Sequence, residues 1–385
     1  MSTLYSRFAT LAALAFAVSS LFVGCGGSGG DQKDEPDEPS VDEVAFARGA
    51  DVSWASEMEY DMEHNPARIN GSAFKDSKGN TGLYPILKAA GVNAIRLRVW
   101  VKPEDANGWS GKDDVVNMAK RAAEAGMSVM IDFHYSDFFA DPSRQNTPAE
   151  WAGLDLKGLS AKVAEHTKDV LTALKSAGVT PHWVQVGNET RPGMLWETGR
   201  LYNDKGEISG GWSNYAALSN AGYDAVKSVF PAAKVIIHID NAYQDNTWFF
   251  DKLKAAGGKF DMIGLSHYPM TNPSMTWKAM NSSAILNIKS LAAKYGCRVM
   301  VCEVGVKNTA SDLAASTLCM TEFMNSVKSL SVCAGVFYWE PQVDGKWRPS
   351  IYERPGRDWG AYNMGAFSSD GSAITPTAIL SAFGE

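Results

Sequence analysis

Beyond Ala45, short runs of apolar and β-branched residues alternate with longer segments whose apolar positions recur at helical spacing. This alternation is typical of parallel strands joined by crossover helices, and no change in composition marks a second domain. Glycines that can end a helix in the left-handed conformation stand just before several predicted strands, as at Gly91 and Gly126. The sequence therefore predicts a single α/β domain with the eight strands of a (β/α)8 TIM barrel, at residues 49–54, 93–100, 128–135, 182–189, 234–241, 260–268, 298–305 and 335–339.

The N-terminal segment has a different composition from the rest of the chain. Residues 1–24 place Arg7 before an apolar run that ends at Gly24, which is the pattern of a signal peptide. A small residue directly before Cys25 resembles the bacterial lipobox, and this resemblance implies that Cys25 is lipidated; an ordinary secretory signal is the alternative. Residues 25–44 are rich in Gly, Ser, Pro and acidic residues, as in a flexible linker. We therefore expect an exported lipoprotein, on the outer membrane or the cell surface, with its catalytic domain at residues 45–385.

Charge and cysteine usage exclude two classes of function. The net charge is -7 with acidic and basic residues interspersed, so no basic stripe is available for nucleic acid. Cys297, Cys302, Cys319 and Cys333 show no C-x-x-C spacing and no clustered His, so we expect no metal site of the zinc type. A disulfide between Cys297 and Cys333 is conceivable, but buried free thiols are the favoured interpretation.

Polar residues collect at the carboxyl ends of the predicted strands. In a TIM barrel these ends build the active site, and a purely structural core has no reason to place charges there. Taken one at a time these residues are weak signals, but together they indicate a functional site. They are Asp51 and Ser53, Arg96 and Arg98, Asp132 and His134, Asn188 and Glu189, His238 and Asp240, His267 and Tyr268, Glu303, and Trp339 and Glu340.

Two of these residues suit glycoside hydrolysis. Glu189 and Glu303 end the fourth and seventh strands, which face each other across a closed barrel. One carboxyl group can then protonate the leaving oxygen while the other attacks the sugar, a retaining arrangement that needs a separation of about 5 to 5.5 Å. We expect Tyr268 to orient Glu303 and Arg96 to keep it ionised, whereas the acid needs a raised pKa. A helix start at residues 187–189 and a buried ion pair at Glu303 are the structural alternatives.

Five segments together resemble one family. GADVSW (49–54), NAIRLRVWV (93–101), IDFHYSD (131–137), VGNET (186–190) and LSHYP (265–269) are similar to the arabinogalactan endo-β-1,4-galactanases, glycoside hydrolase family 53 of the retaining barrel clan. The resemblance implies that the substrate is β-1,4-galactan, as in pectin side chains. It also implies Glu189 as acid/base and Glu303 as nucleophile. The candidate substrate-binding residues are Asp51, Trp54, Arg96, His134, Asn188, His238, His267, Tyr268, Trp339 and Trp347.

The sequence departs from the family in one loop, and it leaves two alternative functions open. Some bacterial members of this family bind calcium through an oxygen-rich run after the seventh strand, but residues 304–316 here read VGVKNTASDLAAS, so we expect no cofactor. We expect a monomer. A related glycosidase acting on another β-1,4-glycan such as mannan is an alternative. A non-catalytic glycan-binding lipoprotein is another, but it predicts the loss of one carboxylate and both are present.

Overall fold

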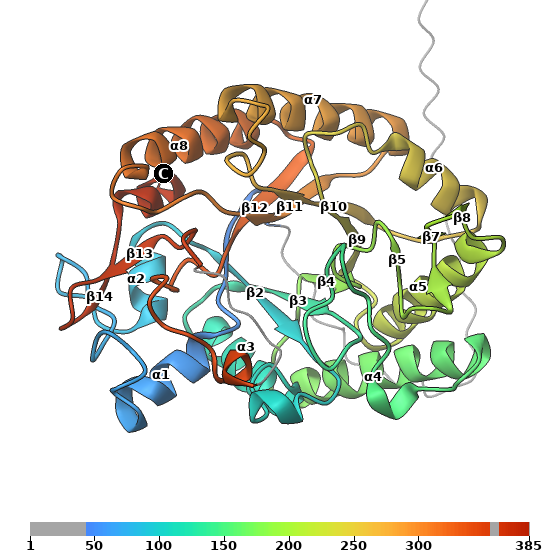
Figure 1. Cartoon of the computed structure of the whole chain (residues 1–385), viewed down its shortest axis with the longest axis horizontal. Coiled ribbons are helices and arrows are strands. Elements are labelled where there is room, and N and C mark those ends of the chain that lie inside the picture. Colours follow the sequence, from blue (N-terminus) through green and yellow to red (C-terminus); the bar gives the residue numbers. More distant parts are fainter. Residues whose placement is uncertain (1–43, 355–361, 385) are drawn as a thin grey trace, which may run out of the picture. The chain divides into compact units, whose positions relative to one another are not determined.

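A computed structural model describes residues 44–354 and 362–384. Eight parallel strands close into a barrel in the order β1-β12-β11-β10-β9-β4-β3-β2, and helices surround it (Figure 1). The predicted TIM barrel is confirmed, with each predicted strand present and its ends shifted by a few residues. The barrel strands are β1 (Ala47–Asp51), β2 (Ala94–Val99), β3 (Ser128–Phe133), β4 (Trp183–Val186), β9 (Lys234–Ile239), β10 (Met262–His267), β11 (Val299–Val304) and β12 (Cys333–Trp339).

The helices present one apolar face to the barrel. In the helix from Leu156 to Ser176, Leu159, Val163, Val170 and Leu174 are buried at helical spacing, and Asp155 caps the first turn by accepting from Gly158 N. The helices are α1 (Ala55–His64), α2 (Leu83–Ala89), α3 (Lys112–Glu124), α4 (Leu156–Ser176), α5 (Gly211–Val229), α6 (Thr247–Ala255), α7 (Trp277–Tyr295) and α8 (Leu313–Lys328), with a 3₁₀ helix η4 (Ala378–Phe383) packed near α8.

The inside of the barrel is divided into an apolar half and a polar half. Near the amino ends of the strands, inward side chains form a separate apolar cluster that includes Met130, Trp183, Ile236, Met300 and Phe337. Toward the carboxyl ends the inward side chains are charged or polar and nearly all buried. The apolar half closes the barrel, so that only the carboxyl end can open to substrate.

Long connections add short pieces of structure around the carboxyl end. The chain between β4 and α5 forms two hairpins, and a third hairpin stands near the C-terminus (Figure 1). These are β5 (Gly193–Met194) with β6 (Gly199–Arg200), β7 (Tyr202–Asn203) with β8 (Gly206–Glu207), and β13 (Phe367–Ser369) with β14 (Ile374–Pro376); the other 3₁₀ turns are η1 (Glu104–Ala106), η2 (Ala149–Trp151) and η3 (Ser350–Glu353).

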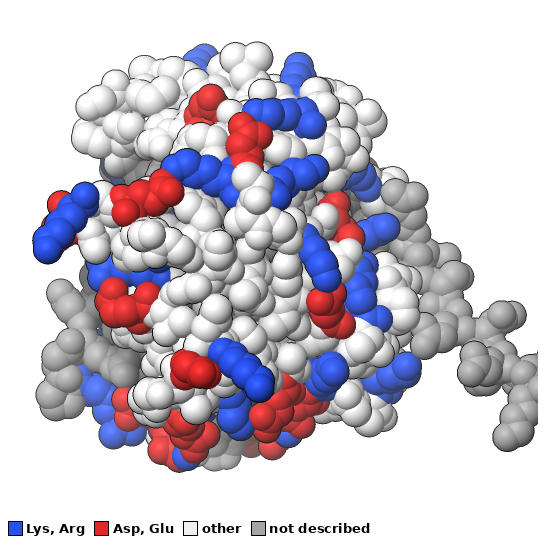
Figure 2. Space-filling model, turned by 90° about the vertical axis from the view of Figure 1, so that its right-hand side faces the viewer, with Lys and Arg blue, Asp and Glu red and all other residues white. Residues whose placement is uncertain are grey.

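Basic and acidic side chains are interspersed on the face shown in Figure 2, and they form no stripe of one sign there. Among the residues that the structure describes, no helix is long and apolar enough to span a membrane. The four cysteines in that part of the chain are free, with Cys297 partly exposed and the others buried, so the prediction of buried free thiols is confirmed for Cys302, Cys319 and Cys333. The predicted signal peptide, Cys25 and most of the linker lie outside the described residues.

Candidate active site

A bulge in β11 turns Glu303 into the barrel. Along β10 and β11, Leu265 pairs with Val301 but Ser266 pairs with Glu303, so Cys302 is an extra residue on β11. The Cys302 side chain faces the interior as well, because a Cβ added to Gly264 would lie 2.7 Å from its sulfur. The bulge therefore gives β11 two successive inward residues, of which the second is a carboxylate.

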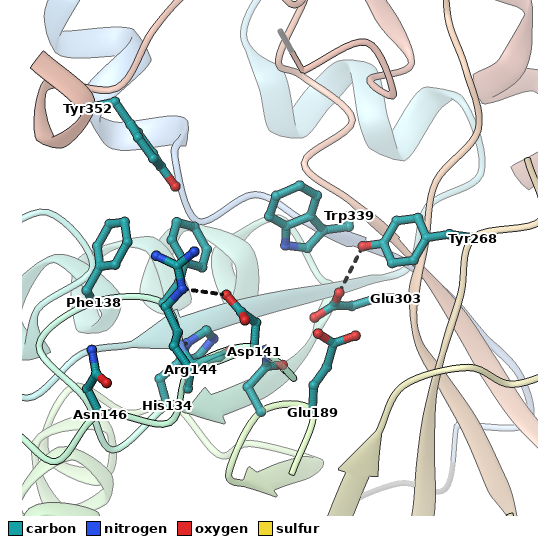
Figure 3. Close-up of a pocket in the computed structure, with 13 residues that line it drawn as sticks. His134, Phe138, Asp141, Arg144, Asn146, Glu189, Tyr268, Glu303, Trp339 and Tyr352 are labelled. Atoms are coloured by element: carbon teal, nitrogen blue, oxygen red, sulfur yellow. Dashed lines mark hydrogen bonds and ion pairs between the residues drawn. The ribbon is translucent and has the colours of Figure 1, made fainter. Parts of the chain in front are cut away.

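Glu189 stands on a tight turn just after β4. Its φ of 46° is in the left-handed region, which a non-glycine residue adopts only where its surroundings hold it. Thr190 supplies that restraint, since both its backbone N–H (2.8 Å) and its hydroxyl (3.1 Å) donate to the carbonyl of His238 on β9. This strained turn directs the Glu189 side chain toward Glu303 instead of along the strand (Figure 3). The alternative of a helix start is excluded, because α5 begins only at Gly211.

The two carboxyl groups lie in the wall of one open cavity of about 750 Å³ (Figure 3). Aromatic rings from three connections form much of the remaining wall, and they offer flat apolar surfaces beside polar groups, as carbohydrate sites do. The lining residues are His134, Phe138, Phe139, Ala140, Asp141, Arg144, Asn146, Asn188, Glu189, Tyr268, Glu303, Trp339 and Tyr352.

Glu303 is held at both of its oxygens. Arg96 Nη2 lies 3.0 Å from Oε1, and the Tyr268 hydroxyl donates to Oε2 over 2.9 Å. Both partners agree with the roles predicted from the sequence. Burial nevertheless raises the pKa of Glu303, because it outweighs the lowering by Arg96 and by Tyr268. The pKa of Glu303 is therefore shifted upward, whereas the charge of Arg96 alone would shift it downward.

Among the residues that the structure describes, no Lys, Arg or His forms an ion pair with Glu189. Burial raises its pKa well above the usual value, and the negative charge of Glu303 raises it further. Two neighbouring carboxylates of this kind titrate as a pair, in which one proton is held more strongly than the other. Glu189 is the member that keeps the proton, since Glu303 has Arg96 beside it.

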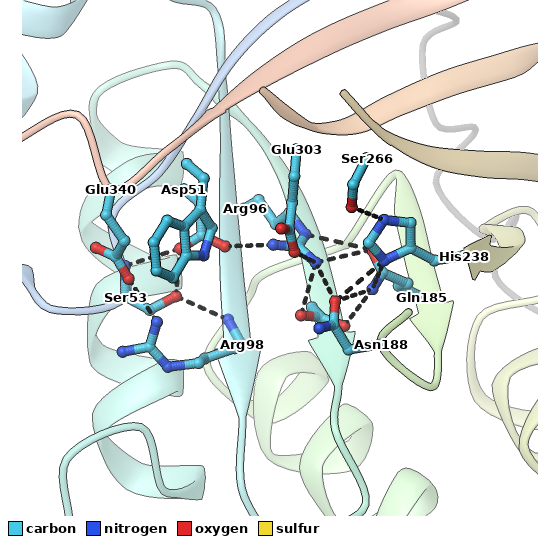
Figure 4. Close-up of polar contacts among 12 residues, drawn as sticks. Asp51, Ser53, Arg96, Arg98, Gln185, Asn188, His238, Ser266, Glu303 and Glu340 are labelled. Atoms are coloured by element: carbon cyan, nitrogen blue, oxygen red, sulfur yellow. Dashed lines mark hydrogen bonds and ion pairs between the residues drawn. The ribbon is translucent and has the colours of Figure 1, made fainter. Parts of the chain in front are cut away.

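A buried polar network joins the strands beneath the cavity (Figure 4). Arg96 on β2 donates to Asp51 (2.7 Å) and Asp132 (2.8 Å) in addition to its contact with Glu303. It also donates to the side-chain oxygens of Gln185 (3.1 Å) and Asn188 (2.9 Å). These contacts orient the carboxamide of Asn188, whose nitrogen donates to Ala140 O at 2.8 Å. The amide thus faces the cavity in a fixed orientation.

The structure separates the twelve predicted site residues into two groups. Six of them line the cavity, and their contacts with sugar remain predictions: His134, Asn188, Glu189, Tyr268, Glu303 and Trp339. The other six are at most 1% exposed and lie behind the cavity wall, so the prediction that they bind substrate directly is corrected: Asp51, Trp54, Arg96, His238, His267 and Trp347.

The six buried residues contact other protein residues behind the cavity wall. His267 points out of the barrel, where its Nε2 meets Asn281 on α7 at 2.8 Å. Trp347 packs against Trp54 and donates from Nε1 to Asp61 on α1 at 2.9 Å. The Trp54 ring lies under the guanidinium of Arg98, 4.0 Å from its centre. Asp51, Arg96 and His238 belong to the network that orients the cavity residues.

Sequence reasoning missed two members of this network. Gln185 on β4 donates to Asp132 (2.5 Å) and to His238 Nδ1 (2.9 Å), and Ser266 on β10 lies 2.8 Å from His238 Nε2. Strand alternation could have found Ser266. Side chains two residues apart share a face, so an inward Tyr268 implies an inward Ser266 and an outward His267.

The comparisons with known proteins agree with this geometry. The sequence profile of glycosyl hydrolase family 53 matches residues 47–378. The chain belongs to glycosyl hydrolase family 53. As a family 53 chain it is a glycosyl hydrolase, and the family resemblance and enzyme class predicted from the sequence are confirmed.

Individual relatives cover most of this family 53 domain. An arabinogalactan endo-β-1,4-galactanase of Thermothelomyces thermophilus is 37% identical over 295 residues, 70% of this chain and 84% of the relative. An endo-β-1,4-galactanase of Bacillus subtilis is 30% identical over 361 residues, 86% of this chain and 78% of the relative. A solved structure of a fungal β-1,4-galactanase aligns with a TM-score of 0.71 at 32% identity, covering 88% of this chain and 99% of that chain.

Within residues 44–354 and 362–384, no three His, Cys, Asp or Glu side chains are grouped to hold a metal ion. The groups around Glu189 and Glu303 can hold, donate and accept protons, and they can attack a carbon centre.

Proposed function

We propose that the protein cleaves internal β-1,4-galactosidic bonds of galactan by a double displacement that retains the anomeric configuration. One observation carries the mechanism: Glu189 and Glu303 point toward one another from the wall of one cavity, and only Glu303 has a cation at its carboxylate (Figure 3). The substrate is proposed from the galactanases that this chain is similar to.

In the first step, Glu303 attacks the anomeric carbon while Glu189 gives its proton to the departing glycosidic oxygen. The raised pKa of Glu189 favours the protonated form that gives this proton. Arg96 and Tyr268 favour the ionised form of Glu303 and orient its carboxylate, and the product of the step is a galactosyl ester of Glu303.

In the second step, Glu189 is ionised and accepts a proton from water, which attacks the same carbon from the opposite side. Glu303 leaves as a carboxylate, and its negative charge returns next to Arg96 and Tyr268. Two inversions give net retention. Asn188 presents its amide at the cavity wall, where it is placed to donate to the sugar hydroxyl beside the reacting carbon.

The decisive experiment combines two variants with a substrate panel. Glu189→Gln and Glu303→Gln each remove an essential proton or electron pair, so each is expected to abolish hydrolysis of linear galactan while the melting temperature stays close to wild type. Substantial activity in either variant would overturn the roles. Faster cleavage of mannan than of galactan by the wild type would overturn the substrate.

Stereochemistry provides an independent test of the mechanism. The first galacto-oligosaccharides released should carry the β configuration, visible by proton NMR before mutarotation. Initial α product would mean that a water molecule separates Glu303 from the sugar, as in inverting enzymes.

We also keep the proposal that the enzyme is a lipoprotein anchored through Cys25, which rests on the sequence alone. Incorporation of labelled palmitate into the wild type but not into Cys25→Ala would support it, and equal labelling of both would refute it.

A further inference from the structure

Ser266 stands between a histidine and the residue assigned as acid. It is 2% exposed, and its hydroxyl lies 2.8 Å from His238 Nε2 on the neighbouring strand β9 (Figure 4). The same side chain lies on the Glu189 side of the active site and lowers the pKa of the Glu189 carboxyl group. Ser266 and Glu189 also share the wall of a second cavity of about 250 Å³, on the β9 and β10 side of the active site.

The surroundings of His238 determine which of its nitrogens carries the proton. Burial lowers the pKa of His238 well below its usual value, so the ring is neutral and carries a single proton. Two donors converge on Nδ1, the amide nitrogen of Gln185 at 2.9 Å and the backbone N–H of Glu189 at 3.3 Å. The Gln185 amide cannot be reversed, because its oxygen accepts from Arg96.

The remaining neighbour of Nδ1 is Asn188 Oδ1 at 3.0 Å, which already accepts from Arg96. Nδ1 therefore acts as an acceptor, and the single proton of His238 is on Nε2. From there it is donated to the Ser266 oxygen, which leaves the Ser266 hydrogen free to be donated onward.

We propose that Ser266 is a positioning residue for Glu189: its hydroxyl, oriented by neutral His238, donates to the Glu189 carboxylate and stabilises the ion that remains after proton donation. This inference rests on the proposed role of Glu189 as acid/base. The chain of donors runs in one direction, from His238 Nε2 to the Ser266 hydroxyl to Glu189, so the site is prepared for the charged state before substrate binds.

Negative charges around Glu189 act in the opposite direction to Ser266. Glu303 on β11, Asp240 after β9 and Asp141 after β3 all disfavour a second charge at Glu189. Asp240 is itself paired with Arg191, and Asp141 lies 3.1 Å from Arg144.

Two uncharged groups also lie near Glu189. They are His238, which is neutral, and Tyr268, whose pKa is raised well above its usual value by burial and by Glu303. Among the groups named here, Ser266 favours the ion and three carboxylates favour the acid.

The test is the pH profile of kcat/KM on linear galactan. Its basic limb marks the loss of the Glu189 proton. Ser266→Ala removes a hydrogen bond that lowers the pKa of Glu189, so the limb is expected to move to higher pH. Ser266→Cys keeps the side-chain shape but is a weak donor, so it should move the limb in the same direction. Asp240→Asn removes a charge that raises this pKa and should move the limb to lower pH.

Activity on a second substrate separates positioning from general damage. Galactan hydrolysis by Ser266→Ala is expected to fall about tenfold or more, since hydrogen bonds to charged groups are among the stronger ones. An aryl galactoside with a good leaving group needs little acid assistance, so its first step should fall far less. Ser219→Ala removes a fully buried hydroxyl from α5, remote from the two carboxylates in sequence and contacts, and should leave the limb in place.

The outcomes separate this inference from the proposed function. If Glu189→Gln still hydrolyses galactan, the acid/base assignment itself is wrong. If Glu189→Gln is inactive but Ser266→Ala and Ser266→Cys keep the wild-type limb, or lose activity equally at every pH and on both substrates, Ser266 is only structural and the inference is overturned.

Discussion

Tyr268→Phe should slow the second chemical step far more than the first. Tyr268 donates to Glu303 Oε2 over 2.9 Å, and its raised pKa keeps the hydroxyl protonated as a donor. The bond is strong while Glu303 is an ion, weakens when Glu303 becomes an ester, and recovers as the ester breaks. Phenylalanine keeps the ring that packs near Gly305 and removes only this donor.

The expected fall in kcat follows from how the strength of this hydrogen bond changes between the two steps. A hydrogen bond to a charged group contributes about 1.5–3 kcal/mol, and each 1.36 kcal/mol corresponds to about tenfold in rate. If most of the charge has returned to Glu303 in the second transition state, kcat should fall about 10- to 150-fold. In the first step the carboxylate of Glu303 loses its negative charge, so kcat/KM at the pH optimum should change much less than kcat. KM should therefore fall together with kcat.

Stopped-flow kinetics with an aryl galactoside can resolve the two steps. We expect a burst of released phenol and a glycosyl-enzyme detectable by mass spectrometry in Tyr268→Phe. The acidic limb of kcat/KM should also move to higher pH. In the wild type the Tyr268 hydrogen bond lowers the pKa of Glu303, so its removal raises that pKa. Tyr135→Phe is the matched control, since that buried hydroxyl contacts Thr167 at 2.8 Å and neither catalytic carboxylate. Equal losses in kcat and kcat/KM, without a burst, would refute the reasoning.

Four further predictions concern stability and accessibility. Burial raises the pKa of Glu57 to about 7, so the folded state favours its protonated form; this stabilisation is complete below about pH 4.5 and is lost as pH rises through 7. The melting temperature of Glu57→Gln minus that of the wild type should therefore be larger at pH 8 than at pH 5. A larger difference at pH 5 would contradict this. Gly264→Ala should destabilise the fold by about 1–3 kcal/mol in urea titration, because the new methyl group would lie 2.7 Å from Cys302 Sγ, and an unchanged midpoint would refute that clash. Native protein should react with a thiol reagent at Cys297 faster than at the buried cysteines of the barrel, whose modification should require unfolding. EDTA should leave galactanase activity and melting temperature unchanged, and a loss restored by calcium would show a metal site.

The sequence was sufficient for the barrel and for placing two carboxylates, Glu189 and Glu303, in one cavity. Strand and helix periodicities differ clearly here, and the apolar strands are buried on both faces, as β2 is at all six positions. Glu189 and Glu303 were identified because charged residues at the ends of such strands have no structural explanation. Tyr268 and Arg96 were assigned to Glu303 correctly, because neighbouring strand ends lie close together in a closed barrel.

Direct substrate contacts were harder to predict, because the polarity of a residue does not show which way its side chain points. His267 and Tyr268 are adjacent and both polar, yet one meets α7 and the other meets Glu303. Trp347 was predicted to bind substrate, but it is buried and its indole N–H has a buried partner in Asp61. For His267 and Trp347 the decisive contact is a residue on a helix, α7 or α1, whose packing the local pattern does not specify.

The difference between acid and nucleophile is the part of the site that only packing could supply. Both residues are glutamates at strand ends, and burial raises the pKa of both. What separates them is that the β11 bulge at Cys302 brings Glu303 to Arg96, while the left-handed turn at Glu189 directs that side chain toward Glu303, whose negative charge raises the pKa of Glu189 further. Neither the bulge nor the turn has a distinct sequence signal, since cysteine is ordinary in a strand and a non-glycine residue at positive φ is not expected. The roles that we propose for two chemically identical residues therefore depend on two backbone irregularities, one in β11 and one just after β4.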